Sequence, residues 1–378
     1  MSSVIRIYIF KLMKILIVDN AAISQRDGIY YVYKSTGEFG RELKSFGHSV
    51  EFFQFFRKTP SSISDFNLIK HQLLFSTARI YKSKVLTYFY SYLKGSWRTI
   101  NSDFVYIFYP NSFSFLAIFA LVSRRKFGLY IRGEVGLHNW ITKLLCKNAS
   151  VVFTVSPSFT DMVNSFVLNP IAHTIRPMTS FTTGDMAKNR KFDKIADFNI
   201  LFLGRIDRDK GLFELLEAVA LIRSKMHIAF QVSIIGGGSD LDLLKDLAAT
   251  LNILDIVNFK GVLSDVQEVR NEYLNSDIFV LPTYHEGFPR TLYEAMIFGV
   301  PIITTFVGGI SALMRDGYNC FEIQPKSVES IVEIVGLVMN NYKDTEKVVH
   351  NGFLTVSEVF NSSKQSHAAH LNQILKSK

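Results

Sequence analysis

Two acids lie eight positions apart in the segment LPTYHEGFPRTLYEAMIFGVP, which runs from Leu281 to Pro301. Glu286 falls in a predicted loop, and Glu294 falls in the second turn of the helix expected to follow it. The two carboxylates are not expected to touch, but they can bind two parts of one elongated ligand over the helix start. Gly287 removes a side chain where a ligand would approach, and Pro289 suits the first turn of a helix. The pattern indicates a site for a polar, phosphate-bearing ligand; the alternative is a helix whose acids complement its dipole or face water.

A second group of candidates follows the strand predicted at Phe198–Leu203. The segment GRIDRDKG begins at Gly204 and leads into a helix, and Arg205 and Lys210 supply positive charge there. This is the position of a phosphate site in a parallel sheet; the alternative is an exposed loop whose bases pair with neighbouring acids. Gly236 opens a run of three glycines after the next strand and is a weaker candidate, because the G-x-G-x-x-G spacing is absent.

Strands and helices alternate along both halves of the chain, which is typical of a doubly wound α/β fold. A strand from Lys14 to Val18 is expected to end in a loop with Asp19 and Asn20, and a helix to begin within Arg26–Tyr33. A long helical stretch is expected over Asn67–Trp97. Further strands are predicted at Leu129–Arg132, Val151–Ser156, Phe230–Ile235, Asp277–Leu281 and Ile302–Thr304.

The pattern divides the chain into a first domain over 13–177, a polar linker over 178–197, and a second domain over 198–341. Helices over 342–378 are expected to pack back towards the first domain. Residues 1–12 lack a convincing secretory signal and are interpreted as an extension before Met13. The uncharged stretch Phe104–Val122 is nearly long enough to span a membrane, but Pro110 and its polar neighbours favour a strand, a turn and a buried helix.

Composition indicates a globular protein of 378 residues, 48% hydrophobic and 20% charged, which is enough for two cores. The two cysteines, Cys146 and Cys320, are far apart in sequence, so a disulfide framework or cysteine metal site is not expected. A reducing, cytoplasmic location is the expectation.

The net charge of +9 is uneven, because residues 1–190 carry 24 Lys and Arg against 10 Asp and Glu. Within Arg57–Arg98, eight bases and one acid are interleaved with aromatic residues. Such a surface favours peripheral contact with anionic lipid at the inner face of the cell membrane. The alternative is that the aromatic residues are core and the bases a solvated face. No recognition motif indicates a nucleic-acid partner.

Six segments in order, GRIDRDKG, IIGGG, NFKG, LPTYHEGFPRTLYEAM, PIITTFVGG and RDGYN, resemble the motifs of retaining glycosyltransferases of the GT-B fold, family 4 (glycosyl transferases group 1). The resemblance covers roughly Asn199–Ile323. It implies two Rossmann-like doubly wound domains facing a cleft, the first binding the acceptor and the second the nucleotide sugar.

The resemblance also implies roles for individual residues. Arg205 and Lys210 would neutralise the donor diphosphate, Glu286 would bind hydroxyls of the donor sugar, and Glu294 would bind the ribose. The loop residues that would complete the donor site are Gly204, Gly236, Gly287, Phe288 and Pro289. In the first domain, the candidates for acceptor or donor contacts are Asn20, Arg132 and Glu134.

The chain departs from the family pattern at several positions. It has Gly28 alone where members often carry a glycine pair, and Arg132-Gly133-Glu134 where many have a histidine. It reads GGISA where GGIPE is common, and Cys320 where glycine is usual.

The activity that the resemblance implies is transfer of a sugar from a UDP- or GDP-sugar to a hydroxyl of a glycan or lipid-linked acceptor. Cell-surface polysaccharide, lipopolysaccharide or capsule, would be the product. No cofactor is expected, and no bound metal. Two alternatives stay open: a sugar-nucleotide epimerase of the same architecture, and a non-catalytic nucleotide-sugar-binding subunit.

Overall fold

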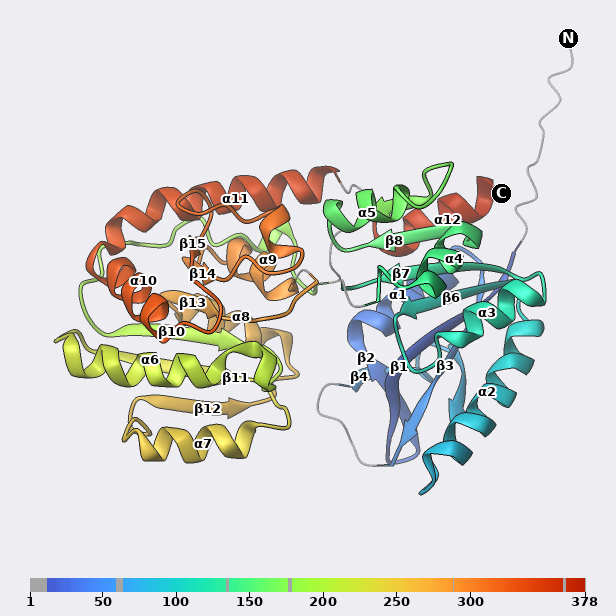
Figure 1. Ribbon diagram of the computed structural model, residues 1–378, viewed down its shortest axis with the longest axis horizontal. Helices are drawn as coiled ribbons and strands as arrows, with labels where there is room; N and C mark the ends of the chain where they lie inside the picture. The colour runs from blue at the N-terminus through green and yellow to red at the C-terminus, as the bar shows by residue number, and fades with distance from the viewer. Residues whose placement is uncertain are drawn as a thin grey trace, which may run out of the picture. The chain divides into compact units, whose positions relative to one another are not determined.

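The computed structural model describes residues 12–58, 64–133, 136–175, 179–287, 289–362 and 365–377. The chain forms two compact units, each built on its own sheet (Figure 1). The first unit comprises Met1–Thr154, Thr160–Thr174 and Gln365–Lys378. The second comprises Val155–Phe159 and Ile175–Lys364.

The sheet of the first unit is mainly parallel. Its strands are β1 (Lys14–Arg26), β2 (Ile29–Tyr33), β3 (Ser49–Arg57), β4 (Ser64–Asn67), β5 (Leu74–Ala78), β6 (Phe104–Tyr109), β7 (Lys126–Ile131), β8 (Val151–Thr154) and β9 (Ala172–Thr174). The order is β4-β2-β1-β6-β7-β8-β9, with β3 pairing β1 and β5; β2 pairs antiparallel with both β1 and β4. Every residue of β6 is buried, as expected of a strand covered on both faces.

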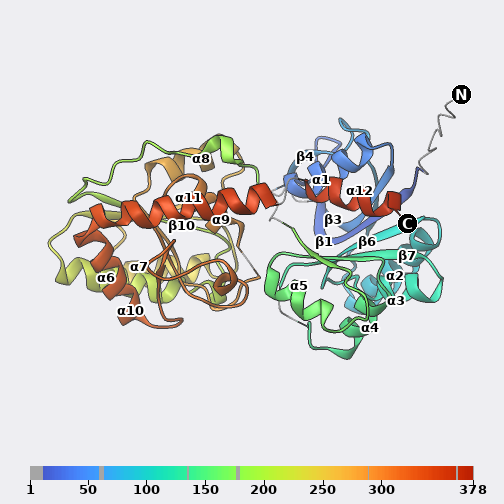
Figure 2. The same ribbon diagram turned by 90° about the horizontal axis from the view of Figure 1, so that it is seen from above.

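Helices cover both faces of this sheet. They are α1 (Lys34–Ser45), α2 (Lys84–Ile100), α3 (Phe115–Val122), α4 (Trp140–Asn148), α5 (Pro157–Asn164, across the boundary between the units) and α12 (His367–Ser377). Although α12 follows the whole second unit in the chain, it packs beside α1 (Figure 2). The rings of His367 and Phe39 lie 4.5 Å apart there.

The start of the chain differs from the sequence-based expectation. Instead of ending at Val18, β1 continues to Arg26, and its pairing with β3 shifts register between Val18 and Ala22, so that Asp19 lies at an irregularity within a strand. Asp27 and Gly28 then have positive φ angles of 48° and 77°, the conformation of a two-residue hairpin turn, which returns the chain as β2. The prediction of a helix beginning within residues 26–33 was therefore wrong, because α1 begins at Lys34.

The helical stretch predicted over Asn67–Trp97 was wrong in its first half. Residues 67 and 74–78 belong to β4 and β5, and parallel pairing of β5 with β3 overrides the local pattern. The helix α2 starts at Lys84, where the Ser83 side chain accepts a hydrogen bond from the Leu86 N–H.

The prediction for Phe104–Val122 is confirmed, since this stretch forms β6, a turn and α3. Within the described ranges, no helix combines the length and the apolar character that crossing a bilayer requires.

The second unit has an all-parallel sheet of order β12-β11-β10-β13-β14-β15. Its strands are β10 (Phe198–Leu203), β11 (Phe230–Ile235), β12 (Val257–Gly261), β13 (Ile278–Leu281), β14 (Ile302–Thr304) and β15 (Phe321–Glu322). Its helices are α6 (Leu212–Lys225), α7 (Leu241–Thr250), α8 (Val266–Asn275), α9 (Arg290–Ile297), α10 (Val328–Asn340) and α11 (Thr345–Ser362). Short 3₁₀ turns are η1 (Thr183–Asp185), η2 (Arg208–Lys210), η3 (Ile310–Ala312) and η4 (Tyr342–Asp344).

The polar segment predicted as a linker, 178–197, lies along the second unit from residue 179 onwards. Its Arg190 donates hydrogen bonds to the carbonyl oxygens of Tyr273 (2.8 Å), Ser276 (2.5 Å) and Phe298 (3.3 Å). Among the C-terminal helices, α11 packs on α9 in the second unit, whereas α12 belongs to the first.

Candidate functional site

Positive charge gathers in the loop that connects β10 to α6. The side chain of Arg205 is 68% exposed and forms an ion pair with Asp207. Lys210 differs, because its side chain is only 7% exposed although it carries a charge. A buried ammonium group needs anionic or carbonyl partners, and their identity defines the site.

Both hydrogen-bond acceptors of Lys210 come from the loop after β13. Its Nζ donates to Glu286 Oε1 at 2.6 Å and to the carbonyl oxygen of His285 at 3.2 Å, and lies 3.5 Å from Asp209 Oδ2. The structure therefore brings together Lys210 and Glu286, two residues that the sequence separates by 76 positions. Because β10 and β13 are parallel neighbours, the loops at their carboxyl ends meet at one edge of the sheet, where such sheets bind ligands.

The main chain around Glu286 is held by the loop after β14. Gly308 has a φ of 57°, and any side chain there would overlap the carbonyl oxygen of Glu286. Gly287 lies in the same contact, since its carbonyl oxygen faces Gly309. The glycine pair Gly308-Gly309 thus allows two loops to pack closely beside the Lys210–Glu286 ion pair.

The start of α9 follows this loop. Pro289 is the residue that precedes the helix, with φ −72° and ψ 127°, and the helix begins at Arg290, so the prediction that Pro289 lies in the first turn was wrong by one position. Phe288, predicted to shape the donor loop, lies outside the described residues.

Glu294, in the second turn of α9, is almost fully buried. Its Oε1 accepts a hydrogen bond from the Thr179 hydroxyl at 2.9 Å, and its Oε2 accepts one from the Tyr273 hydroxyl at 3.0 Å. Burial raises the pKa of Glu294 above its ordinary value, while Arg290 and the two hydroxyls act in the opposite direction. Burial, followed by the charge of Glu294 and its hydrogen bond, raises the pKa of Tyr273 well above its usual range. The two acids of the motif have separate partners, as their spacing predicted.

The loops after β10 and β11 also lie against each other. Gly236, at φ 149°, leaves no room for a Cβ next to the carbonyl oxygen of Gly204. The N–H of Gly204 donates to the carbonyl of Ile235 at 3.0 Å, and the N–H of Ile206 donates to that of Gly237 at 3.0 Å. Gly204 and Gly236 thus lie at the same edge as Lys210, in a contact that the glycine run makes possible.

Of the candidates in the first unit, Arg132 directly follows the carboxyl end of β7, and Asn20 lies within β1. Arg132 pairs with Asp19, with Nη2 and Oδ1 3.5 Å apart, and its guanidinium carbon lies 5.3 Å from the centroid of the Phe108 ring. Asp19 is 2% exposed. Glu134 lies outside the described residues, and the side chain of Asn20 is not described.

Sequence reasoning missed several residues of the site. Thr179 and Tyr273 carry no signal, because they come from an aperiodic segment and an ordinary helix. The triplet Asp207-Arg208-Asp209 was visible, and its acids could ligate a divalent cation, but in the structure they lie beside Arg205 and Lys210. No group of three or more His, Cys, Asp or Glu side chains suited to a metal ion occurs among the residues the structure describes.

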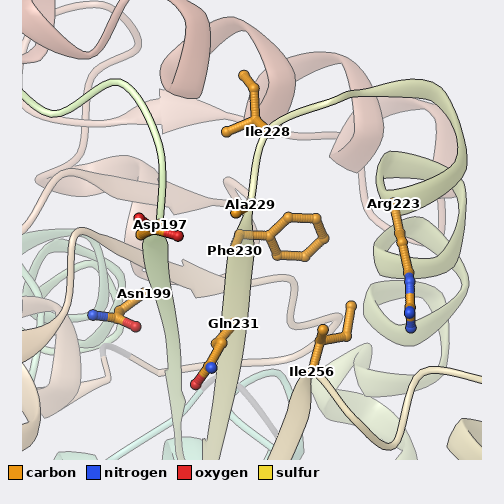
Figure 3. Close-up of a pocket in the computed structure, with 8 residues that line it drawn as sticks. All are labelled: Asp197, Asn199, Arg223, Ile228, Ala229, Phe230, Gln231 and Ile256. Atoms are coloured by element: carbon orange, nitrogen blue, oxygen red, sulfur yellow. The ribbon is translucent and has the colours of Figure 1, made fainter.

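A cavity of ≈ 520 Å³ lies at the opposite edge of the same sheet. It is lined by Asp197, Asn199, Arg223, Ile228, Ala229, Phe230, Gln231 and Ile256, and Figure 3 shows Asp197 and Ala229 at the starts of two neighbouring strands. Arg223 donates to Asp255 nearby. Because these residues lie at or before the amino ends of β10, β11 and β12, or at the end of α6, this cavity is separate from the site around Lys210.

Comparisons with known proteins point to one family for the second unit. Residues 185–354 match the family described as glycosyl transferases group 1. A Bacillus subtilis protein named as a teichuronic acid biosynthesis glycosyltransferase is 30% identical over 170 residues, which are 45% of this chain and 40% of that protein. The capsular polysaccharide biosynthesis glycosyltransferase CapM of Staphylococcus aureus is 30% identical over 179 residues, 46% of this chain and 45% of the relative. The chain thus spans less than half the length of each of these two relatives.

Similarity to solved structures extends over both units. The Anabaena protein Alr3699/HepE, crystallised with UDP and glucose, superimposes with a TM-score of 0.70 at 16% identity, covering 97% of this chain and 100% of that one. A likeness at this identity concerns the fold. The comparisons therefore support the glycosyl transferases group 1 family for residues 185–354, and the chain as a whole has the two-domain α/β fold of GT-B glycosyltransferases.

Proposed function

We propose that the protein transfers a sugar from a UDP- or GDP-sugar to a hydroxyl of a glycan or lipid-linked acceptor, in the synthesis of a cell-surface polysaccharide. The observation that carries this proposal is the buried Lys210 at the carboxyl edge of a parallel sheet, hydrogen-bonded to Glu286, the first of the two acids that lie eight positions apart. The family match, the names of the two relatives and the UDP and glucose in the Anabaena crystal support it.

The charges at this edge suit a nucleoside diphosphate as leaving group. As the bond between the sugar and the phosphate breaks, negative charge grows on the phosphate oxygen. Lys210 and Arg205 stabilise that charge electrostatically, with the N–H groups at the start of α9 as further donors. Because Lys210 is already desolvated and held by protein partners, little reorganisation is needed when the charge develops.

Glu286 would bind the sugar of the donor, and Glu294 would bind its ribose. When a diphosphate approaches Lys210, it competes with Glu286 for the ammonium group, and the carboxylate becomes available to accept hydrogen bonds from sugar hydroxyls. Glu294 would accept from the ribose, where the hydroxyls of Thr179 and Tyr273 now donate to it.

The same proposal includes retention of anomeric configuration by attack of the acceptor hydroxyl on the face the phosphate leaves, with the departing phosphate taking the proton. It also includes independence from a divalent metal and action at the cytoplasmic side of the membrane. No carboxylate is assigned as nucleophile.

The experiment is release of nucleoside diphosphate by the purified full-length chain with each common nucleotide sugar, with and without a membrane extract as acceptor source, and with a chelator. We expect release from one donor, dependent on the extract and unchanged by the chelator. The product's anomeric configuration, read by NMR, tests retention.

Two controls separate this proposal from its alternatives. Glu286→Gln should abolish release while Glu346→Gln, an exposed acid on α11, should leave it unchanged. Conversion of the nucleotide sugar into an isomer without acceptor would identify an epimerase instead. Donor binding without release or conversion would identify a binding subunit, and either result would overturn the transferase proposal.

A further inference from the structure

The helix α2 buries small residues and exposes large apolar ones, which is the reverse of an ordinary surface helix. Its buried residues recur every fourth position and are small, namely Thr87, Ser91, Gly95 and Thr99. This ridge packs against the sheet and α3, since a Cβ at Gly95 would meet Leu116 at 2.8 Å and Phe53 at 3.1 Å. A surface helix normally turns its large apolar side chains towards the core.

The large apolar residues of α2 point outward instead. We define its outer face as Val85, Leu86, Phe89, Leu93, Trp97 and Ile100. Val85 is 77% exposed, Leu93 63% and Phe89 62%. At 3.6 residues per turn the six positions fall within an arc of about 120°. They form one stripe along the helix. Figure 1 shows the helix α2 itself at the edge of the first unit, beside α3.

The apolar surface continues beyond the helix. Phe115, at the start of α3, is 58% exposed, and its ring centroid lies 6.2 Å from that of Tyr92. Tyr88 and Tyr90 are exposed on either side of the stripe. A contiguous exposed patch of this kind marks a contact surface rather than ordinary surface composition.

The charges around the outer face have one sign. Residues 66–102 contain no Asp or Glu and six Lys or Arg. Arg98 forms an ion pair with Glu51 at 3.1 Å, and Lys94 donates a hydrogen bond to the carbonyl oxygen of Thr77 at 2.8 Å. Lys82 and Lys84, exposed beside the first turn of α2, form no ion pair with any described residue. An anionic partner would therefore complement this end of the helix.

We propose that the outer face of α2 binds the surface of a membrane that contains anionic lipid. The apolar side chains enter the boundary between headgroups and acyl chains, Trp97 and the tyrosines lie at headgroup level, and Lys82 and Lys84 contact lipid phosphates. A second copy of this chain fits less well, because residues 66–102 carry six bases and no acid, so the same segment of another copy offers this face no opposite charge. The inference concerns the first unit and does not depend on the proposed transfer reaction.

The test is flotation of the full-length protein with vesicles of phosphatidylcholine alone and of phosphatidylcholine mixed equally with phosphatidylglycerol. We expect binding to the anionic vesicles and much weaker binding to the neutral ones. A variant with Leu86→Ser, Phe89→Ser, Leu93→Ser and Trp97→Ser should lose at least about ten-fold in partitioning, given the apolar area removed. The matched control changes four exposed leucines of the second unit, Leu243, Leu254, Leu274 and Leu337, to Ser and should bind like wild type.

Tryptophan fluorescence provides a second measurement, which reports the environment of α2 directly. The chain has two tryptophans, Trp97 and Trp140, so in a Trp140→Phe background the emission reports α2 alone. We expect a blue shift on adding anionic vesicles. Lys82→Gln with Lys84→Gln should weaken binding to anionic vesicles without affecting stability.

Three outcomes would overturn the proposal. One is no binding to anionic vesicles by a folded wild-type protein. Another is equal loss of binding in the four-serine variant and its second-unit control. The third is a dimer in sedimentation velocity that the four-serine variant disrupts while vesicle binding persists, which would assign the face to self-association.

Discussion

The two units keep their candidate functional residues in opposite environments. The second unit draws Lys210 and Glu294 out of solvent and satisfies each with specific partners, whereas the first turns the apolar residues of α2 into solvent and buries small ones. A buried charge depends on individual partner atoms, while an apolar surface acts through its total area. Single substitutions should therefore have large effects at the sheet edge of the second unit and small, cumulative effects on the outer face of α2.

The largest effect is expected from Lys210→Met. It removes the buried cation while keeping most of the side-chain volume, and loss of one preorganised electrostatic group typically lowers kcat by about 10²–10³-fold. Steady-state release of nucleoside diphosphate measures it. Lys245→Met, on the exposed side of α7, is the matched control and should retain full activity. Wild-type kcat in the Lys210 variant would remove this residue from the proposed mechanism.

The inverted packing of α2 predicts that its inner ridge resists large residues. Gly95→Leu should lower the free energy of unfolding of the first unit by about 1–3 kcal/mol, because Leu116 and Phe53 leave no space. On the exposed side, Tyr90→Leu should change it by less than about 0.5 kcal/mol. Urea unfolding followed by circular dichroism compares the two. Similar losses in both variants would mean that the two faces of the helix do not differ as described.

Acid should affect the first unit through a buried histidine. Burial, with a smaller contribution from His370, lowers the pKa of His367 from 6.5 to about 3, and its Nε2 is hydrogen-bonded to the Tyr106 hydroxyl at 2.5 Å. Below about pH 6.5 the unfolded chain binds a proton that the folded unit does not, so stability falls as pH drops towards about 3. The contribution is up to about 1.4 kcal/mol per pH unit.

His367→Gln should remove that part of the pH dependence. Thermal unfolding between about pH 6 and pH 4 is the measurement, and the slope of stability against pH is the readout, since the substitution also changes stability at every pH. The control is His350→Gln, an exposed histidine on α11. An unchanged slope in His367→Gln would show that other groups cause the acid sensitivity.

The smallest effect is expected from Tyr273→Phe. The ring remains stacked on Phe298, with centroids 5.3 Å apart, but the hydroxyl that donates to Glu294 is lost. We expect about 1 kcal/mol of destabilisation, and a donor KM raised several-fold with kcat nearly unchanged, because the carboxylate is less well oriented. Calorimetry and donor titration measure the two effects. A fall in kcat with unchanged KM would contradict a role in orienting the ribose-binding acid.

Most of the second unit could be predicted because its signals are local. The strands at Phe198–Leu203, Phe230–Ile235 and Ile302–Thr304 were predicted with the bounds the structure has. The partners of Glu294 could not be predicted, since Thr179 is 115 positions from it and no period or motif connects them.

The first unit shows two different reasons for failure. The dipeptide Asp27-Gly28 is a hairpin signal that was present in the sequence and overlooked. For α2, the basic and aromatic composition was evident, but a pattern of apolar residues does not reveal which side of a helix faces the core. Only the small residues of the inner ridge show which side faces the core. Why they must be small depends on Leu116 and Phe53, which come from other elements.

The position of α12 in the chain also has a consequence for biosynthesis. His367, Leu371 and Leu375 are buried, and the His367 ring contacts Tyr106 and Phe153 of the first sheet. During translation, the first unit therefore leaves the ribosome without the helix that completes its core. That helix is made only after the whole second unit has been translated. The aromatic side chains that α12 covers, Tyr106 and Phe153 among them, stay uncovered during that time, and the part of the protein made first is the part that finishes folding last.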